Sequence, residues 1–283
     1  RSGYLKVGKG NSALGFIFYA KEGASAADML NYPVVIWLNG GPGSSSQLGN
    51  FMENGPFRIQ PKNLAPYEII KNEHTWMKDY NVLFVDQPVG TGLSYADETQ
   101  TGVYCTNMDQ VAADFYVALK ELYQGANGCF NKLGIKPDHH LVIFGESYGG
   151  KYAPAIGEKI IREAQDKGGF LTGLKGVAIG DGFTHPYNIL TMAGEYAYNM
   201  GLIDHQERAR VEQIIINATY QDRLRLWDDL HLSFDNVLDN IVEWAGNVNV
   251  YDITTYQEYP DALVGIYLNS PDARALYKWN ADV

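Results

Sequence analysis

One pentapeptide constrains the fold of this chain more than any other feature. It is Gly145-Glu146-Ser147-Tyr148-Gly149, preceded by an apolar run at residues 141–144 and followed by a helical pattern at residues 151–167. A Gly-x-Ser-x-Gly motif between a buried strand and a helix is typical of a nucleophile elbow, in which the serine occupies a strained turn and small neighbours let the turn close. The sequence therefore predicts that Ser147 is a nucleophile; the alternative is a glycine turn without chemistry.

A second glycine-rich segment, Asn39-Gly40-Gly41-Pro42-Gly43, follows the apolar run at residues 34–38. A serine that attacks a carbonyl group needs backbone N–H donors for the oxyanion that forms. The usual donors are the residue after the nucleophile and a residue in a loop after an earlier strand. We therefore expect the N–H groups of Tyr148 and Gly41 to form an oxyanion hole. The alternative is a tight loop of purely structural importance.

Short apolar runs and helical patterns alternate along the first two thirds of the chain. Continuous apolar runs bounded by Gly and Pro are typical of strands covered on both faces. Strands that alternate with helices indicate a mostly parallel sheet with helical crossovers. We therefore predict an α/β fold of the α/β-hydrolase type, with helices flanking the sheet. The expected strands are residues 3–7, 14–19, 34–38, 82–85, 141–144 and 176–179, with helices at 108–124 and 151–167.

The pattern changes after Gly182, where residues 189–245 show helical periodicity and no strand-like run. This favours a helical insertion, or cap, after the sixth strand region. We predict that residues 1–182 form the N-terminal part of the core. Residues 183–256 would form the insertion, and residues 257–283 would return towards a C-terminal part of the core whose last strands are missing from this chain.

Composition excludes several classes of protein. A net charge of −11 disfavours a nucleic-acid partner. The sequence has no run of about 18 apolar residues, so we expect no membrane span. The spacings of His and Cys match none of the common ligand patterns, so we predict no metal site. Acyl transfer by serine needs no cofactor, and we predict none.

The chain contains two cysteines and one possible glycosylation sequon. Cys105 and Cys129 flank a predicted helix about 27 Å long, and the five residues after it can return only about 17 Å, so we expect no bond between these cysteines. Asn217-Ala218-Thr219 is a sequon, which makes Asn217 a glycosylation candidate in a secretory protein. Such tripeptides also occur by chance.

Taken together, the longer motifs resemble those of serine carboxypeptidases, the family of yeast vacuolar carboxypeptidase and lysosomal cathepsin A. The resemblance covers the chain from its first residues to its last. The segments that carry it are Gly3-Tyr4-Leu5, residues 37–46 (WLNGGPGSSS), Glu53-Asn54-Gly55-Pro56, residues 86–95 (DQPVGTGLSY), residues 145–152 (GESYGGKY), Ile179-Gly180-Asp181-Gly182 and Val250-Tyr251-Asp252-Ile253.

The resemblance implies roles for particular residues. Ser147 would be the nucleophile, and Gly41 and Tyr148 would form the oxyanion hole. A third group would bind the terminal carboxylate of the substrate: Asn39, Gly40, Glu53 and Glu146. Carboxyl groups held close together share protons, which raises an apparent pKa and implies an acidic pH optimum. Without the resemblance, a solvated helix residue would be the favoured interpretation of Glu53.

Two positions depart from the family pattern. Ser44 stands where many members have a disulfide-forming cysteine, so we expect that bridge to be absent. Asp181 stands where the family usually has Asn. Because it should end a strand it could be mistaken for a catalytic acid, but we expect a structural turn residue.

The catalytic acid and histidine are missing from the pattern. In this fold they follow the serine, each at the end of a later strand. Three histidines precede Ser147, and the other three lie in or beside the predicted helical insertion. The resemblance places residues 266–271 just before the missing acid and histidine. We therefore expect that a second chain, or a segment beyond Val283, carries them, and that this chain alone is inactive.

The expected function is that of a serine carboxypeptidase acting on the C-termini of peptides or proteins through an acyl-enzyme on Ser147. The family implies a lysosomal, vacuolar or secreted enzyme and a possible homodimer. Two alternatives remain open. A carboxypeptidase-like acyltransferase would keep much of the motif set, and an inactive homologue would instead bind or protect a partner.

Overall fold

The computed structural model describes residues 1–63, 65–126 and 128–278. They form two compact units. Unit 1 comprises residues 1–182 together with the described part of residues 260–283, and unit 2 comprises Phe183–Tyr259. Residues 279–283 of the predicted return segment lie outside the described residues.

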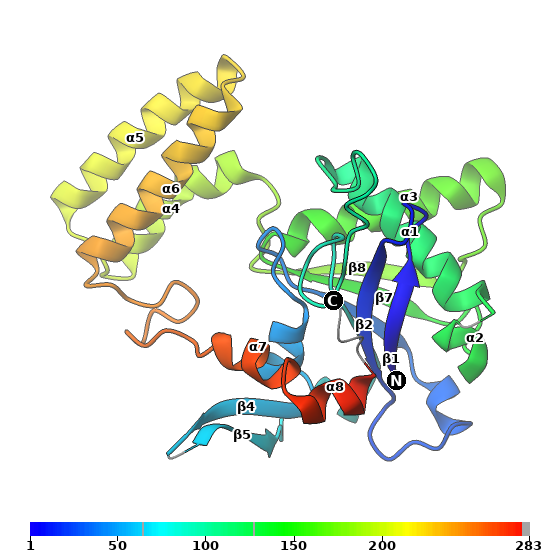
Figure 1. Cartoon of the computed structure of the whole chain (residues 1–283). Coiled ribbons are helices and arrows are strands. Elements are labelled where there is room, and N and C mark those ends of the chain that lie inside the picture. Colours follow the sequence, from blue (N-terminus) through cyan, green and yellow to red (C-terminus); the bar gives the residue numbers. More distant parts are fainter. Residues whose placement is uncertain (64, 127, 279–283) are drawn as a thin grey trace. The chain divides into compact units, whose positions relative to one another are not determined.

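Unit 1 is built on a mixed sheet in the order β1-β2-β6-β3-β7-β8 (Figure 1). β1 pairs with β2, and β2 with β6, in antiparallel fashion, whereas β6, β3, β7 and β8 are parallel neighbours. Their bounds are β1 Ser2–Lys6, β2 Ala13–Tyr19, β3 Val34–Leu38, β6 Asn81–Val85, β7 Leu141–Glu146 and β8 Leu174–Gly180. The predicted strands and their mostly parallel arrangement are confirmed.

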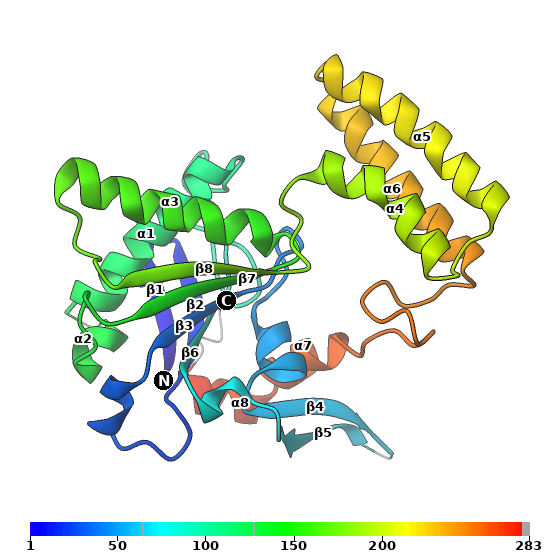
Figure 2. The same ribbon diagram turned by 180° about the vertical axis from the view of Figure 1, so that it is seen from behind.

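Helices α1 (Met108–Gln124), α2 (Cys129–Leu133) and α3 (Gly149–Lys167) cover one face of this sheet (Figures 1 and 2). Side chains alternate between the two faces along a strand. Phe16 and Phe18 of β2 therefore join the core under these helices, whereas Ile17 joins a cluster on the opposite face. Cys105 and Cys129 are both free thiols within this chain.

The opposite face is covered by elements that the sequence did not predict. A hairpin of β4 (Phe57–Lys62) and β5 (Ala65–Lys71) lies beside two short helices, α7 (Ala262–Leu268) and α8 (Pro271–Tyr277). Phe51 joins them, with its ring 5.2 Å from that of Tyr267. Short helical turns at Asp28–Asn31, Gly49–Glu53 and Trp76–Lys78 complete the unit.

Unit 2 consists mainly of three helices, α4 (Pro186–Asn199), α5 (His205–Arg223) and α6 (Trp227–Trp244). The helical pattern predicted for residues 189–245 is confirmed. The helices share a small core that includes Leu190, Val211 and Val237. Asn217 is exposed on α5. No helix in the described part of the chain is long and apolar enough to cross a membrane.

Candidate active site

Ser147 lies at the corner between β7 and α3, as the motif predicts. Its φ of +55° is in the left-handed region, which residues with a side chain rarely adopt. Two backbone hydrogen bonds hold this conformation. Ser147 N donates to Gly180 O at 3.1 Å, and Ser147 O accepts from Gly150 N at 2.9 Å. The turn therefore presents the serine at the carboxyl end of a parallel strand, the edge at which α/β sheets bind ligands.

The glycines on either side of the serine are required by close backbone packing. A Cβ added at Gly145 would overlap the carbonyl oxygen of Gly149, and one added at Gly149 would lie 2.6 Å from the carbonyl oxygen of Leu38. The elbow thus packs against the end of β3 as well as on itself. Any side chain at either position would force the turn open.

The glycine-rich loop after β3 lies directly against the elbow. A Cβ added at Gly40 would overlap Tyr148 N and crowd Glu146 O, so the two predicted oxyanion segments are in contact. Gly41 has a φ of +99°, and its N–H makes no hydrogen bond within the described residues. That group is exposed and remains available to a ligand.

Asn39 connects the two glutamates that the resemblance singled out. Its Nδ2 donates to Glu53 Oε1 at 3.2 Å and to Glu146 Oε2. Its Oδ1 accepts from Trp37 Nε1 at 2.8 Å and from Gly49 N at 3.0 Å, and these two obligate donors fix the orientation of the amide. Both carboxyl groups therefore converge on one nitrogen beside the elbow.

Burial raises the pKa of Glu53, and the negative charge of Asp181 adds to this effect, while the hydrogen bond from Asn39 opposes it. Asp181 itself follows β8 with a φ of +38°; burial raises the pKa of its carboxyl group, and the nearby backbone of Ser147 opposes this effect. Asp181 thus lies in the turn that directly follows β8.

Asp86 directly follows β6 and begins the motif at residues 86–95, but the sequence predicted no role for it. It is fully buried, and its carboxylate accepts from Ser45 Oγ at 2.8 Å, Gln47 Nε2 at 3.3 Å and Leu93 N at 2.8 Å. It therefore ties the segment after the glycine-rich loop to the loop after β6. An acidic residue that directly follows a buried parallel strand was the available signal.

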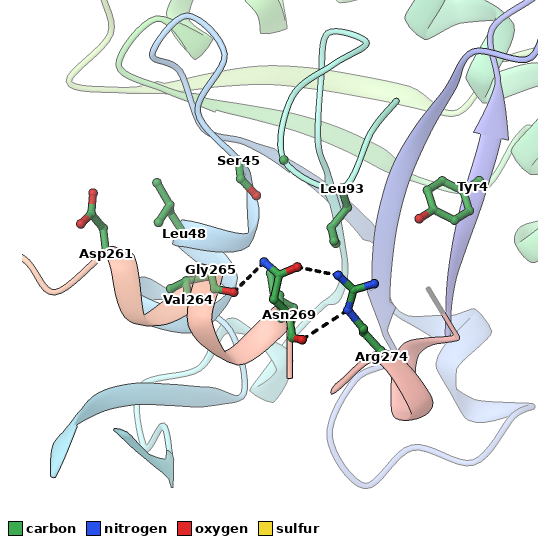
Figure 3. A pocket seen from close by; sticks show the side chains of 11 residues that line it. Tyr4, Ser45, Leu48, Leu93, Asp261, Val264, Gly265, Asn269 and Arg274 are labelled. Atoms are coloured by element: carbon green, nitrogen blue, oxygen red, sulfur yellow. Dashed lines mark hydrogen bonds between the residues drawn. The ribbon is translucent and has the colours of Figure 1, made fainter. Parts of the chain in front are cut away.

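A cavity of about 220 Å³ opens beside this network (Figure 3). Ser45 and Leu93, both bound to Asp86, form part of its wall, and Arg274 contributes a guanidinium group that donates to Asn269 Oδ1 at 2.8 Å. Ser147 does not line it. The remaining lining residues are Tyr4, Leu48, Gly92, Asp261, Val264, Gly265, Leu268 and Asn269.

None of the six histidines forms a hydrogen bond with Ser147 within the described residues. His139 Nε2 lies 2.8 Å from Tyr32 O, His185 caps the N-terminus of α4, and His231 lies 3.7 Å from Asp235. Among the described residues, no group of three or more His, Cys, Asp or Glu could hold a metal ion.

Proteins similar to this chain carry the name serine carboxypeptidase. Serine carboxypeptidase-like 48 of Arabidopsis thaliana is 34% identical over 262 residues, which cover 89% of this chain and 48% of that protein. Venom serine carboxypeptidase of Apis mellifera is 36% identical over 239 residues, covering 84% and 47% respectively. Probable serine carboxypeptidase CPVL of Homo sapiens is 31% identical over 291 residues, covering 96% and 56%.

A solved structure shares the fold. The crystal structure of Kex1(Δ)p, a prohormone-processing carboxypeptidase from Saccharomyces cerevisiae, superposes with a TM-score of 0.77 at 20% identity, covering 100% of this chain and 64% of that one. The chain spans about half the length of the first curated relatives that it matches. The serine carboxypeptidase family profile matches residues 1–278, and the chain therefore belongs to the serine carboxypeptidase family, with the α/β-hydrolase fold.

Proposed function

We propose that this chain carries the nucleophile and the carboxylate-recognition site of an enzyme that removes C-terminal amino acids from peptides or proteins. The observation that supports this most directly is the convergence of Glu53 and Glu146 on Asn39 next to the Ser147 elbow. An acyl-transfer site that acted only inside peptide chains would have no need for paired carboxyl groups at this position.

In the proposed reaction, Ser147 Oγ attacks the carbonyl carbon of the last peptide bond and transfers its proton to a base. The N–H groups of Gly41 and Tyr148 stabilise the oxyanion that forms. The C–N bond breaks, the amine takes up a proton and leaves as the free amino acid, and the peptide remains as an ester on Ser147. Water then hydrolyses the ester and regenerates the serine.

The substrate carboxylate would bind at Asn39, Gly40, Glu53 and Glu146. An ionised substrate carboxylate is repelled by ionised glutamates, so binding requires that at least one of them be protonated. The raised pKa of Glu53 favours this state at acid pH. We therefore propose an acidic pH optimum, which suits a lysosomal, vacuolar or secreted location.

The acid and histidine that activate Ser147 would come from a further polypeptide segment, either a second chain or the remainder of a longer one. The outer edge of β8 supports this proposal. Within the described residues β8 pairs only with β7, and its side chains Val177 and Ile179 are 38% and 44% exposed. Strands of parallel sheets are normally covered on both faces, and unpaired edges are normally protected.

A fluorophosphonate probe tests the proposed nucleophile, because it reacts with activated serines. Native protein, with any copurifying polypeptide retained, should be labelled at Ser147, and Ser147→Ala should abolish the label. Paired peptides that differ only in a free or amidated C-terminus test the substrate class. Release of the terminal residue from the free form alone supports a carboxypeptidase.

Two results would argue for the alternatives. Labelling with acyl transfer to an alcohol in preference to water would indicate an acyltransferase. Absence of labelling in the native preparation, with the fold intact, would indicate an inactive binding protein, which the lack of a histidine hydrogen-bonded to Ser147 within the described residues would then explain.

A further inference from the structure

Gly43, in the glycine-rich loop after β3, is held by Tyr152 on α3, the helix that follows Ser147. The backbone N–H of Gly43 donates to the phenolic oxygen of Tyr152 at 3.3 Å. Tyr152 lies in the first turns of α3, only five residues after Ser147. One rigid element thus presents the nucleophile and also contacts the loop that should bind the oxyanion.

Apart from this bond, the loop is closed by one backbone hydrogen bond, from Ser44 N to Gly40 O at 3.1 Å. Gly41 and Gly43 have φ angles of +99° and +87°, both are exposed, and glycine loses more backbone freedom on ordering than any other residue. The nearest atom to a Cβ added at Gly43 is Thr91 Oγ1 at 3.9 Å, so packing around this residue is loose. Residues 41–43 make no other hydrogen bond within the described part of the chain.

Tyr152, in contrast, is firmly placed. Its side chain is 1% exposed, and its ring packs edge-to-face on that of Tyr148 at a centroid distance of 5.2 Å. The Lys151 ammonium lies 5.2 Å from the centroid of the Tyr148 ring. Burial raises the pKa of Tyr152 to about 12, so its oxygen stays neutral throughout the range in which the enzyme would work.

We propose that Tyr152 is a positioning residue, which fixes Gly43 and thereby keeps the Gly41 N–H directed at the oxyanion that forms on the Ser147 adduct. This inference rests on the proposed function, because the loop needs a fixed geometry only if an oxyanion is formed there. Preorganised donors stabilise a transition state because they need not reorient during the reaction. The contribution of Tyr152 is therefore to turnover and not to the binding of substrate.

Tyr152→Phe tests this role, since it removes one oxygen and keeps the buried ring. In the native enzyme, with its remaining polypeptide present, kcat for a blocked dipeptide should fall about 10-fold to 100-fold, somewhat less than the 10²–10³ typical for losing an oxyanion donor outright. KM should stay within about twofold, because the carboxylate-binding residues are untouched. The Gly43 amide should also exchange with solvent deuterium at least about tenfold faster, because its acceptor is lost.

Tyr123→Phe provides a matched control. Tyr123 is also buried, at 3% exposure on α1, and its hydroxyl has no hydrogen-bond partner within the described residues. This variant should leave kcat, KM and Gly43 exchange unchanged. Thermal unfolding of both variants should remain close to wild type, which separates a positioning effect from a loss of folded protein.

The outcomes distinguish the two proposals. If wild-type enzyme turns over substrate and Tyr152→Phe has a kcat within twofold of it, the positioning role is wrong and the proposed function stands. If kcat and KM change together, Tyr152 supports the site only in a general structural way, and the inference is again wrong. If wild-type protein neither turns over substrate nor reacts with the fluorophosphonate, the proposed function has failed, and this inference fails with it.

Discussion

The side-chain amide of Asn39 donates a hydrogen bond to the carboxyl group of Glu53 at 3.2 Å. Asn39 directly follows β3, whereas Glu53 is the last residue of the helical turn Gly49–Glu53. Glu146 accepts from the same nitrogen, so one amide group links the two carboxyl groups. This relationship leads to the first prediction.

Glu53→Gln should extend activity to higher pH. Burial raises the pKa of Glu53, so in the wild type kcat/KM for a peptide with a free C-terminus should fall as pH rises through that pKa and the side chain ionises. Gln stays neutral, so the kcat/KM of this variant should fall less than that of the wild type as pH rises from the acid plateau to pH 7. Steady-state kinetics from pH 4 to 8 measure this.

Glu68→Gln is the control for this experiment, because Glu68 is a carboxylate of the β4–β5 hairpin that hydrogen-bonds to Gln60. Its pH profile should match the wild type. Identical profiles for Glu53→Gln and wild type would contradict the assigned role of Glu53.

Asp86 should make the folded protein more stable at acid pH than at neutral pH. Burial raises the pKa of Asp86 from 3.8 to about 6, so the folded state binds this proton more tightly than the unfolded state. The free energy of unfolding attributable to Asp86 therefore falls as pH rises between about 4 and 6, by at most about 1.4 kcal/mol per pH unit. Urea unfolding midpoints measured from pH 4 to 7 should show wild type gaining on Asp86→Asn as pH falls.

Asp97→Asn provides a comparison of opposite sign. The hydrogen bond from Thr99 lowers the pKa of Asp97, so the contribution of Asp97 to stability is lost as pH falls. Parallel pH curves for wild type and Asp86→Asn would show that Asp86 titrates alike in the folded and unfolded states.

Gly145→Ala should damage the elbow, whereas the same change one strand away should not. A Cβ at Gly145 would overlap the backbone oxygen of Gly149, which should destabilise the fold by about 1–3 kcal/mol and abolish fluorophosphonate labelling of Ser147. A Cβ at Gly176 of β8 meets nothing within 4 Å, so Gly176→Ala should change stability by less than about 0.5 kcal/mol. Denaturant unfolding and labelling measure both. Equal behaviour of the two variants would refute the close backbone approach.

Asp204→Ala should loosen the start of α5. Asp204 Oδ1 accepts from Gln206 N at 2.7 Å and Glu207 N at 2.8 Å, and Glu207 Oε2 accepts from Asp204 N at 2.7 Å, which completes a capping box. Loss of such a cap destabilises a helix by about 1 kcal/mol, so amides in the first turn of α5 should exchange faster. Asp239→Ala, in the middle of α6 and exposed, should leave α5 exchange unchanged.

The elbow and the central strands could be predicted because local signals there agree with the tertiary structure. The Gly-x-Ser-x-Gly spacing requires a tight turn, and the runs before it are apolar on both faces, so no long-range contact is needed to recognise them. The α/β class followed from their alternation with helices. The residues expected in the oxyanion hole lie in contacting segments for the same reason.

The β4–β5 hairpin could not be predicted from the sequence. Pro61 and Pro66 interrupt its strands, and Pro normally argues against a strand except at an edge or a bulge. The register indeed shifts between Gln60 and Lys62. The network around Asp86 and the bond between Gly43 and Tyr152 also escaped prediction, because they join segments that only the folded sheet brings together.

The contact between the two extremes of unit 1 has a consequence for biosynthesis. Ser2 Oγ donates to Tyr277 O at 2.8 Å, across 275 residues of sequence. At translation rates of about 5–20 residues per second, β1 emerges from the ribosome about 15–55 seconds before its partner in α8 has been made. Unit 2 is a continuous stretch of residues, so its internal contacts can form without this delay. Nascent chains should therefore contain folded helices of unit 2 while the apolar face around Ile17 and Phe51 is still exposed to solvent and accessible to chaperones.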